Sequence, residues 1–162
     1  MAPVIEINVQ PQEIQSQKEE ASLARAAVNR LAFNLTLEVR KAFLEELLRR
    51  LGREKVERQL QNLNHWDEYA PRRIKELAEK LLEERSANIS THIAASHKAF
   101  IRLAWSITHD SELAEEAVSR TCYALWTGET RPEYSNRALK MDALNELARR
   151  EREHERLESL DY

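Results

Sequence analysis

Apolar residues recur every three or four positions along most of the chain from Ser16 onward, which is the period of an α-helix. Only 2 glycines and 4 prolines interrupt the 162 residues, and 33% of the residues are charged. This composition is typical of long helices joined by few turns. We therefore predict an all-α fold, a multi-helix bundle of about six to seven helices.

Capping and turn-forming residues predict where these helices begin and end. Thr36 lies where an N-cap belongs, and Gly52 suits the position just after a helix end. The segment "SANIS", residues 86–90, predicts a weak break because its Asn and Ser can cap a new helix. Ser111 is the expected N-cap of the next helix. The last helix is expected to begin near Ser135, after a loop that contains glycine and proline.

These breaks divide the chain into three expected parts. Residues 1–15 hold two of the four prolines and a short alternating segment, which predicts an extended arm. Residues 16–88 form an N-terminal helical lobe, and residues 89–162 form a second helical domain. The apolar stripe from Val39 to Leu51 is wide enough to bury against another helix pair, so a homodimer through the N-terminal lobe is one expected assembly.

Signals for catalysis, metals and membranes are nearly absent from the sequence. The single Cys122 excludes a disulfide framework and a cysteine-based zinc site. His92 and His97 are five residues apart, which does not place two imidazoles on one helix face. No apolar run approaches the roughly 18 residues of a membrane span. We expect a cytoplasmic protein that is not an enzyme, without a cofactor, a metal or a membrane partner.

The net charge of −3 requires that any contact with nucleic acid come from a local basic patch. The nearest candidates all lie on the last expected helix: Arg137, Lys140, Arg149, Arg152 and Arg156. The last three are spaced three and four residues apart and share a face that can lie along phosphates. Glutamates are interleaved with them, so a solvated helix held by salt bridges is the alternative interpretation.

The segment "HDSELAEEAVSRTCYALW", residues 109–126, has a more particular pattern than an apolar stripe. With the preceding "FIRLAWSITHD" it resembles region 2 of the extracytoplasmic-function sigma factors, small bacterial promoter-specificity subunits of RNA polymerase. The matching positions are Ala114, Glu115, Glu116, Val118, Thr121 and Ala124 to Trp126. The downstream "ALNELARREREHERLESLD" also resembles the family's last region 2 helix, so the likeness covers about residues 96–161 and implies a region 2-like helical domain over 89–162.

The resemblance implies that the helix over residues 111–126 docks on the clamp helices of the largest subunit of the RNA polymerase core. The expected inner face of this helix consists of seven residues: Leu113, Ala114, Ala117, Val118, Thr121, Cys122 and Leu125. With these residues facing the core, an acidic, tyrosine-bearing face points outward and suits a basic helical partner. The expected partner-binding residues are Glu112, Glu115, Glu116, Ser119, Arg120 and Tyr123. Promoter DNA is the other implied partner. Tyr134 is the only aromatic in the loop over residues 127–136, so we expect impaired reading of melted DNA.

Two other functions remain open on the sequence. One is a helical module for protein–protein interaction or dimerisation, which the apolar stripe of the N-terminal lobe favours. The other is a small helical nucleic-acid-binding subunit of a larger complex, which the basic residues of the last helix favour.

Overall fold

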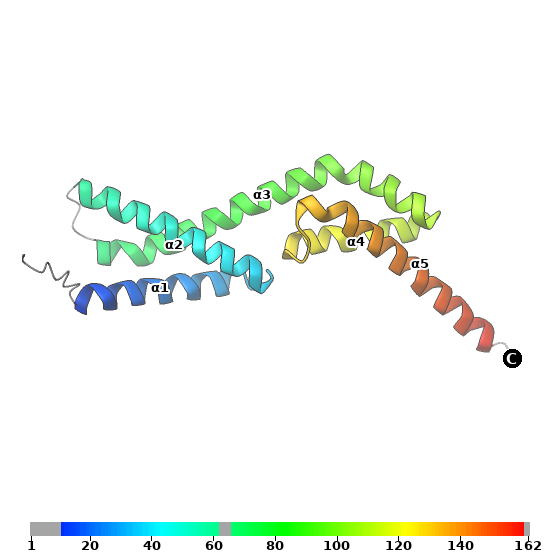
Figure 1. Ribbon diagram of the computed structural model, residues 1–162, viewed down its shortest axis with the longest axis horizontal. Coiled ribbons are helices and arrows are strands. Elements are labelled where there is room, and N and C mark those ends of the chain that lie inside the picture. The colour runs from blue at the N-terminus through cyan, green and yellow to red at the C-terminus, as the bar shows by residue number, and fades with distance from the viewer. Residues whose placement is uncertain (1–10, 62–65, 161–162) are drawn as a thin grey trace, which may run out of the picture. The chain divides into compact units, whose positions relative to one another are not determined.

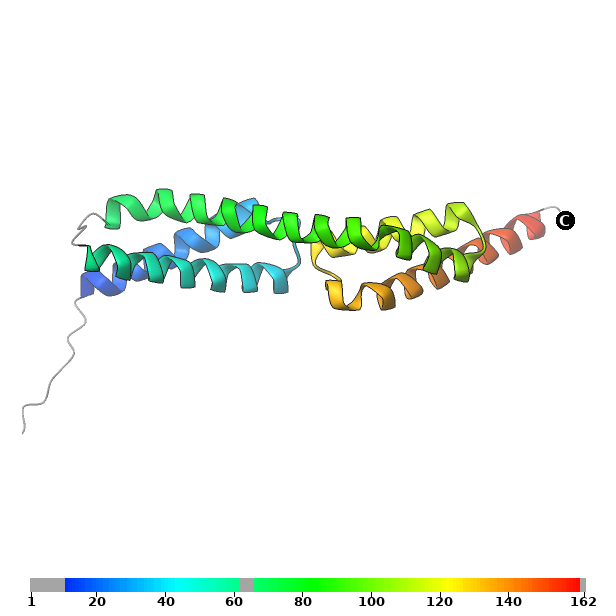
Figure 2. The ribbon, with the colours of Figure 1, turned by 90° about the horizontal axis from the view of Figure 1, so that it is seen from above.

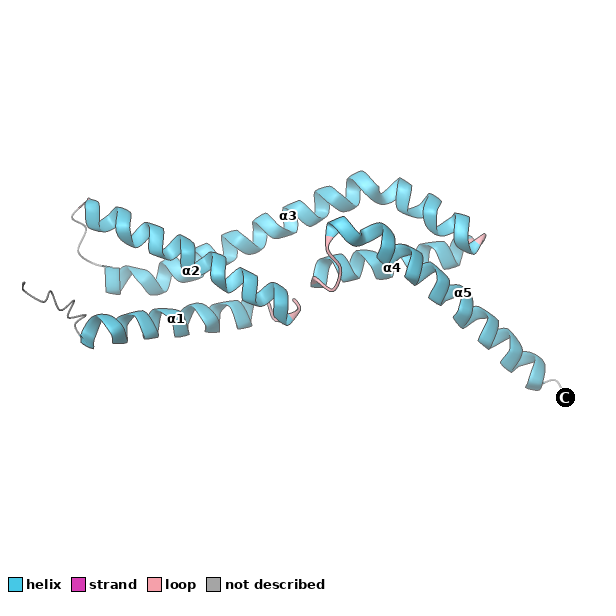
Figure 3. Ribbon diagram, in the orientation of Figure 1, coloured by secondary structure: helices cyan, strands magenta, loops and turns pink. Residues whose placement is uncertain are grey.

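A computed structural model describes the backbone of residues 11–61 and 66–160, with the side chains of residues 17–61, 66 and 68–160 (Figure 1). Five α-helices and one 3-10 helix make up this part of the chain: α1 (Pro11–Leu31), α2 (Leu37–Leu60), α3 (Trp66–Thr108), α4 (Ser111–Thr127), η1 (Pro132–Tyr134) and α5 (Ser135–Leu160). Figure 3 shows no strand among the described residues. The all-α prediction is confirmed, whereas the predicted six to seven helices are too many.

The first predicted break, at Gly52, is wrong because α2 runs through it to Leu60. A glycine inside a helix costs about 1 kcal/mol relative to alanine, which packing on either side can offset. Leu51 is fully buried, and Glu54 receives hydrogen bonds from Arg73 of α3. Contacts that lie far away along the chain therefore keep the helix intact across Gly52.

The second predicted break, over residues 86–90, is also wrong because the segment lies inside α3. It contains neither glycine nor proline, so nothing in it prevents a helical backbone. Ile89 is buried, and the hydroxyl of Thr91 donates to the carbonyl of Ala87 at 2.9 Å, one helical turn earlier. Burial of Ile89 outweighs the weak capping preference of the neighbouring asparagine and serine.

Residues 1–10 of the expected arm lie outside the described residues. Residues 11–15, assigned to the same arm, are helical because α1 begins at Pro11, a residue suited to the first turn of a helix. The described chain divides into two compact units, one with residues 11–33, 37–61 and 66–83, the other with residues 34–36 and 84–160. The sequence-based boundary was placed after residue 88.

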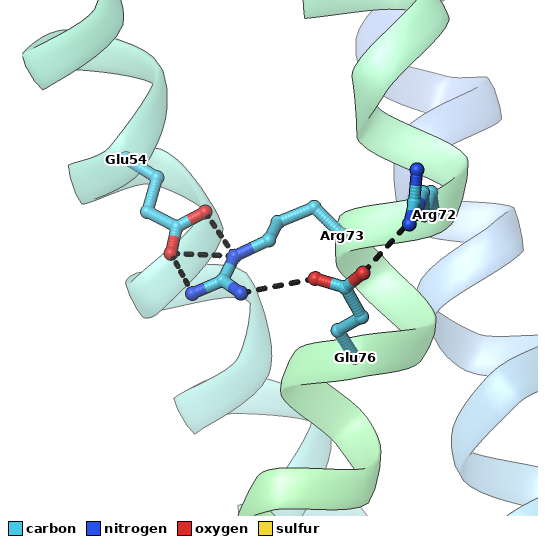
Figure 4. Close-up of polar contacts among 4 residues, drawn as sticks. All are labelled: Glu54, Arg72, Arg73 and Glu76. Atoms are coloured by element: carbon cyan, nitrogen blue, oxygen red, sulfur yellow. Dashed lines mark hydrogen bonds and ion pairs between the residues drawn. The ribbon is translucent and has the colours of Figure 1, made fainter.

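In the first unit, α1, α2 and the first part of α3 lie side by side (Figure 2). Val28, Leu47 and Ile74, one from each helix, are at most 2% exposed and form part of the core. An ion pair also links α2 and α3, in which Arg73 donates to both oxygens of Glu54 at 2.8 and 2.7 Å (Figure 4). These hydrogen bonds raise the pKa of Arg73 above its usual value.

In the second unit, the end of α3 packs with α4 and α5 around one apolar cluster. Its buried members are Ile89, Phe100, Ala104, Ala114, Ala117, Val118, Leu125, Leu139 and Ala143. Many of these are small residues, which allow helices to approach closely. None of the described helices combines the length and apolar character needed to cross a membrane.

Candidate functional site

The start of α4 is fixed by Asp110. The N-cap is this residue and not Ser111, which is the first residue of the helix. The Asp110 carboxylate accepts a hydrogen bond from the backbone N–H of Leu113 at 3.1 Å and another from Arg150 of α5. The bond from Arg150 is the main reason that the pKa of Asp110 is lowered, and the bond from Leu113 adds to it. A carboxylate can cap the helix and pair with α5 at the same time, which a serine hydroxyl cannot do.

The end of α4 is fixed by the adjacent Gly128 and by groups from distant parts of the sequence. Gly128 adopts a left-handed conformation with φ of 87°, and its N–H donates to the carbonyl of Ala124 at 3.0 Å. The guanidinium of Arg85 donates to the carbonyls of Leu125 and Trp126, at 3.1 and 2.8 Å, and burial lowers its pKa. These bonds satisfy carbonyls that the helix itself leaves without partners.

The backbone N–H of Thr36 completes this end of the helix by donating to the carbonyl of Thr127 at 2.8 Å. This contact explains why residues 34–36 belong to the second unit although their neighbours in the chain belong to the first. The hydrogen bond joins positions about ninety residues apart, so no local pattern in the sequence predicts it.

The inner face of α4 lies as the sequence predicts, with one exception. Six of the seven expected residues are buried: Leu113, Ala114, Ala117, Val118, Thr121 and Leu125. Cys122 is half-buried instead, and burial raises the pKa of its thiol. On α5, Leu139 and Ala143 are buried core positions, whereas Leu144 is 51% exposed.

The outer face of α4 carries all six predicted partner-binding residues. Each is exposed: Glu112, Glu115, Glu116, Ser119, Arg120 and Tyr123. Tyr123 is 67% exposed, so most of its ring is free to contact another molecule. Glu112 lies in the first turn of the helix, where the helix dipole favours an acidic side chain, and Glu115 and Glu116 follow in the next turn.

Arg120 differs from the other five because it takes part in an ion pair that reaches into the core. Its Nε lies 2.8 Å from Oε1 of Glu146, which is only 1% exposed. The Nη2 of Arg149 lies 2.9 Å from Oε2 of the same carboxylate. Glu146 is a residue that sequence analysis missed, because in the sequence it is one of many glutamates in a charged helix. Its signal is its spacing of three and seven residues from the buried Ala143 and Leu139.

A shallow groove of about 720 Å³ runs between α4 and α5 next to this ion pair. Ser119, Arg120 and Tyr123 line it from α4, and Met141 and Asp142 line it from α5. Glu129, in the turn after α4, contributes a further carboxylate. The hydroxyl of the buried Thr121 donates to Oδ2 of Asp142 at 2.7 Å, which holds this carboxylate beside the groove. Two helices create the groove together, so the sequence of either one does not reveal it.

The five residues predicted to bind nucleic acid are all exposed on α5: Arg137, Lys140, Arg149, Arg152 and Arg156. They do not form a free basic stripe, because Arg149 is paired with Glu146. Over residues 149–158, the 4 arginines are balanced by 4 glutamates. Use of this helix for nucleic acid stays a prediction.

The contacts of His92 are those of a structural side chain rather than of a metal ligand. Nε2 of His92 lies 3.2 Å from the Ser135 hydroxyl, and its ring meets Phe100 edge-on at 6.1 Å. Among the side chains of residues 17–61, 66 and 68–160, no three of the His, Cys, Asp or Glu type gather as a metal site would require.

No protein-family model matches this chain, and neither the curated proteins nor the solved structures contain a match to it.

Proposed function

We propose that this chain is a sigma factor-like transcription protein that binds the bacterial RNA polymerase core through the outer face of α4. The observation that carries the proposal is the arrangement of that helix. Its ends are fixed by Asp110 and Arg85, and its apolar side faces the core. The side with the predicted docking residues is consequently presented to solvent on a rigid support, as a preorganised binding surface requires.

The chemistry of the outer face favours a basic helical partner. Glu112, Glu115 and Glu116 are exposed, while the positive charge of Arg120 is partly compensated by Glu146, which also pairs with Arg149. The face therefore carries more negative than positive charge, and a complementary charge on the partner steers association. Tyr123 adds a large, mostly exposed ring, the kind of residue that often contributes much of the binding energy of an interface.

The identification of the partner as the clamp helices of RNA polymerase rests on the sequence resemblance over residues 96–161. The test is equilibrium binding of the full chain to purified core polymerase at several salt concentrations. We expect binding that weakens as salt rises, because exposed charges contribute to it. Absence of binding at micromolar concentration would reject the polymerase as the partner.

Promoter DNA is a weaker part of the proposal. Tyr134, the last residue of η1, is 57% exposed, but a single aromatic provides one stacking surface where capture of melted bases uses several. The balanced charges of α5 also argue against a strong phosphate track. We therefore propose polymerase binding as the main activity and expect the isolated chain to bind promoter DNA weakly.

A second candidate function, self-association, is favoured by an apolar row on α2. Residues spaced by four place apolar groups on one ridge: Leu44, Leu48, Gly52, Val56 and Leu60. Val56 is 55% exposed and Leu60 is 80% exposed, and a Cβ added at Gly52 would meet nothing within 4 Å. The row is nearly symmetric about Gly52, so an antiparallel copy of α2 can match it. Sedimentation equilibrium of the parent and of Val56→Asp tests this function.

A further inference from the structure

The groove between α4 and α5 combines apolar and acidic groups within reach of the docking face. Tyr123 and Met141 lie on its two sides and are 67% and 55% exposed. Glu129 and Asp142 bring two carboxylates to the same groove. Such a combination matches a long side chain that is apolar along its stem and positively charged at its end.

The charges of the groove are not compensated within it. Of the described residues that line the groove, Arg120 alone is basic, and its Nε is directed to Glu146 at 2.8 Å. Asp142 accepts one hydrogen bond, from the neutral hydroxyl of Thr121, which leaves its negative charge in place. A cation entering the groove therefore meets two carboxylates and a tyrosine ring, against the one positive charge of Arg120, so the groove lining keeps a net negative charge.

We propose that this groove receives one arginine or lysine side chain from the helix that docks on α4. The stem of that side chain packs between Tyr123 and Met141, and its charged end points to Glu129 and Asp142. Arginine fits better than lysine because its planar group can stack on the tyrosine ring while it donates to carboxylates. This inference rests on the proposed function, which supplies the docking helix. It adds the type of residue through which that helix is anchored.

Other occupants fit the groove less well. An acidic side chain would approach Glu129 and Asp142, where like charges repel. A purely apolar side chain would contact Tyr123 and Met141 but would leave the two carboxylates partly desolvated and without a partner. Both serve as comparison ligands in the test.

The test uses the full chain with ¹³C-labelled methionine methyl groups. Met141 is the only methionine besides the initiator Met1, so its methyl signal is readily assigned. The probes are N-acetyl-arginine methylamide, its uncharged citrulline analogue and the glutamate analogue. We expect the arginine probe to shift the Met141 signal saturably and at lower concentration than either comparison ligand. An unmoved Met141 signal, or an equal response to citrulline, overturns the proposal.

Matched variants locate the binding groups. Glu129→Gln should weaken the response to the arginine probe severalfold, whereas Glu133→Gln, an exposed acid in η1, should leave it unchanged. Tyr123→Phe should keep the response and Tyr123→Leu should reduce it, because the aromatic face attracts the cation. Equal effects of the two glutamine variants would contradict the inference.

The probe experiment is independent of the polymerase, so the two proposals can fail separately. Polymerase binding without a response of Met141 to arginine rejects the groove and keeps the proposed function. A response of Met141 without polymerase binding rejects the polymerase as partner and keeps the groove as a site for a basic side chain.

Discussion

Arg120 of α4 and Glu146 of α5 form an ion pair with 2.8 Å between Nε and Oε1, although Glu146 is 1% exposed and Arg120 is 53% exposed. Arg149 holds the second carboxylate oxygen at 2.9 Å. A buried carboxylate without such partners is strongly unfavourable. The pair therefore links a residue of the proposed docking face to the core side of the neighbouring helix.

Arg120→Ala is expected to destabilise the second unit by leaving Glu146 with one partner. Because Arg120 is half-exposed and solvent can replace part of its interaction, we expect a loss of about 1–3 kcal/mol in the free energy of unfolding. The double variant Arg120→Met, Glu146→Leu should recover most of this loss, since it removes the buried charge as well. Chemical denaturation of the parent and the two variants measures both effects, and a double variant no more stable than Arg120→Ala would contradict the account.

The two faces of α4 could be predicted from sequence because burial there follows the helical period without interruption. Leu113, Val118 and Leu125 are buried, and Glu116 between them is exposed. Glu146 was not predicted, although its spacing from Leu139 and Ala143 fits the buried face of α5. A buried glutamate needs partners, and its two arginines reach it from different helices or turns. From sequence alone a glutamate is expected to be exposed, and only the folded structure reveals the ion pairs that allow it to be buried.

Val118→Asp tests the assignment of the inner face. Val118 is 4% exposed within the apolar cluster of the second unit, and the aspartate would be buried without a partner. We expect a loss of about 3–5 kcal/mol in the free energy of unfolding. Ser119→Asp, at the adjacent exposed position, is the control and should change stability little. A thermal melt of Val118→Asp that matches the parent would show that the faces are assigned wrongly.

The Asp110–Arg150 pair predicts a pH dependence of stability. The pKa of Asp110 is lowered from its ordinary value of 3.8, first by Arg150 and then by the N–H of Leu113. A carboxyl whose pKa is lower in the folded state stabilises the fold above its unfolded pKa, and this contribution is lost as the pH falls through the folded pKa. Asp110→Asn keeps the helix cap and removes the charge. The parent should therefore exceed Asp110→Asn in stability at pH 7, and the difference should shrink below pH 3.8. A difference that does not vary with pH would argue against the pair.

Gly52→Ala separates the stability of the single chain from self-association through α2. The added methyl group meets nothing within 4 Å, and alanine is the better helix former, so the free energy of unfolding should rise by about 0.5–1 kcal/mol. If two copies pack with Gly52 at their crossing point, Gly52→Leu should weaken the dimer by preventing close approach. Sedimentation equilibrium and denaturation distinguish the two effects. A loss of stability in Gly52→Ala that does not depend on protein concentration would contradict the open environment of Gly52.

The helix ends show where sequence-based prediction of this fold reaches its limit. Gly52 and residues 86–90 carry local signals for termination, yet α2 and α3 continue through them. The signals amount to about 1 kcal/mol each, which is less than the burial of one large apolar side chain. At Gly128 the local signal for a helix end agrees with the hydrogen bonds that Arg85 donates from a distant part of the chain, and the predicted loop is confirmed there.

The measurement that tests the central claim most directly is the affinity of the full chain for core RNA polymerase, for the parent and for Glu116→Lys. Glu116 is exposed in the middle of the proposed docking face, so its reversal should leave the fold intact. We expect it to weaken binding by about 1–3 kcal/mol, a factor of about 5 to 150, because the lysine would face a basic helix. Glu79→Lys makes the same charge change at an exposed position of α3 in the first unit and should have little effect. Equal affinities of the parent and Glu116→Lys, or no binding by the parent, would contradict a polymerase-docking role for α4.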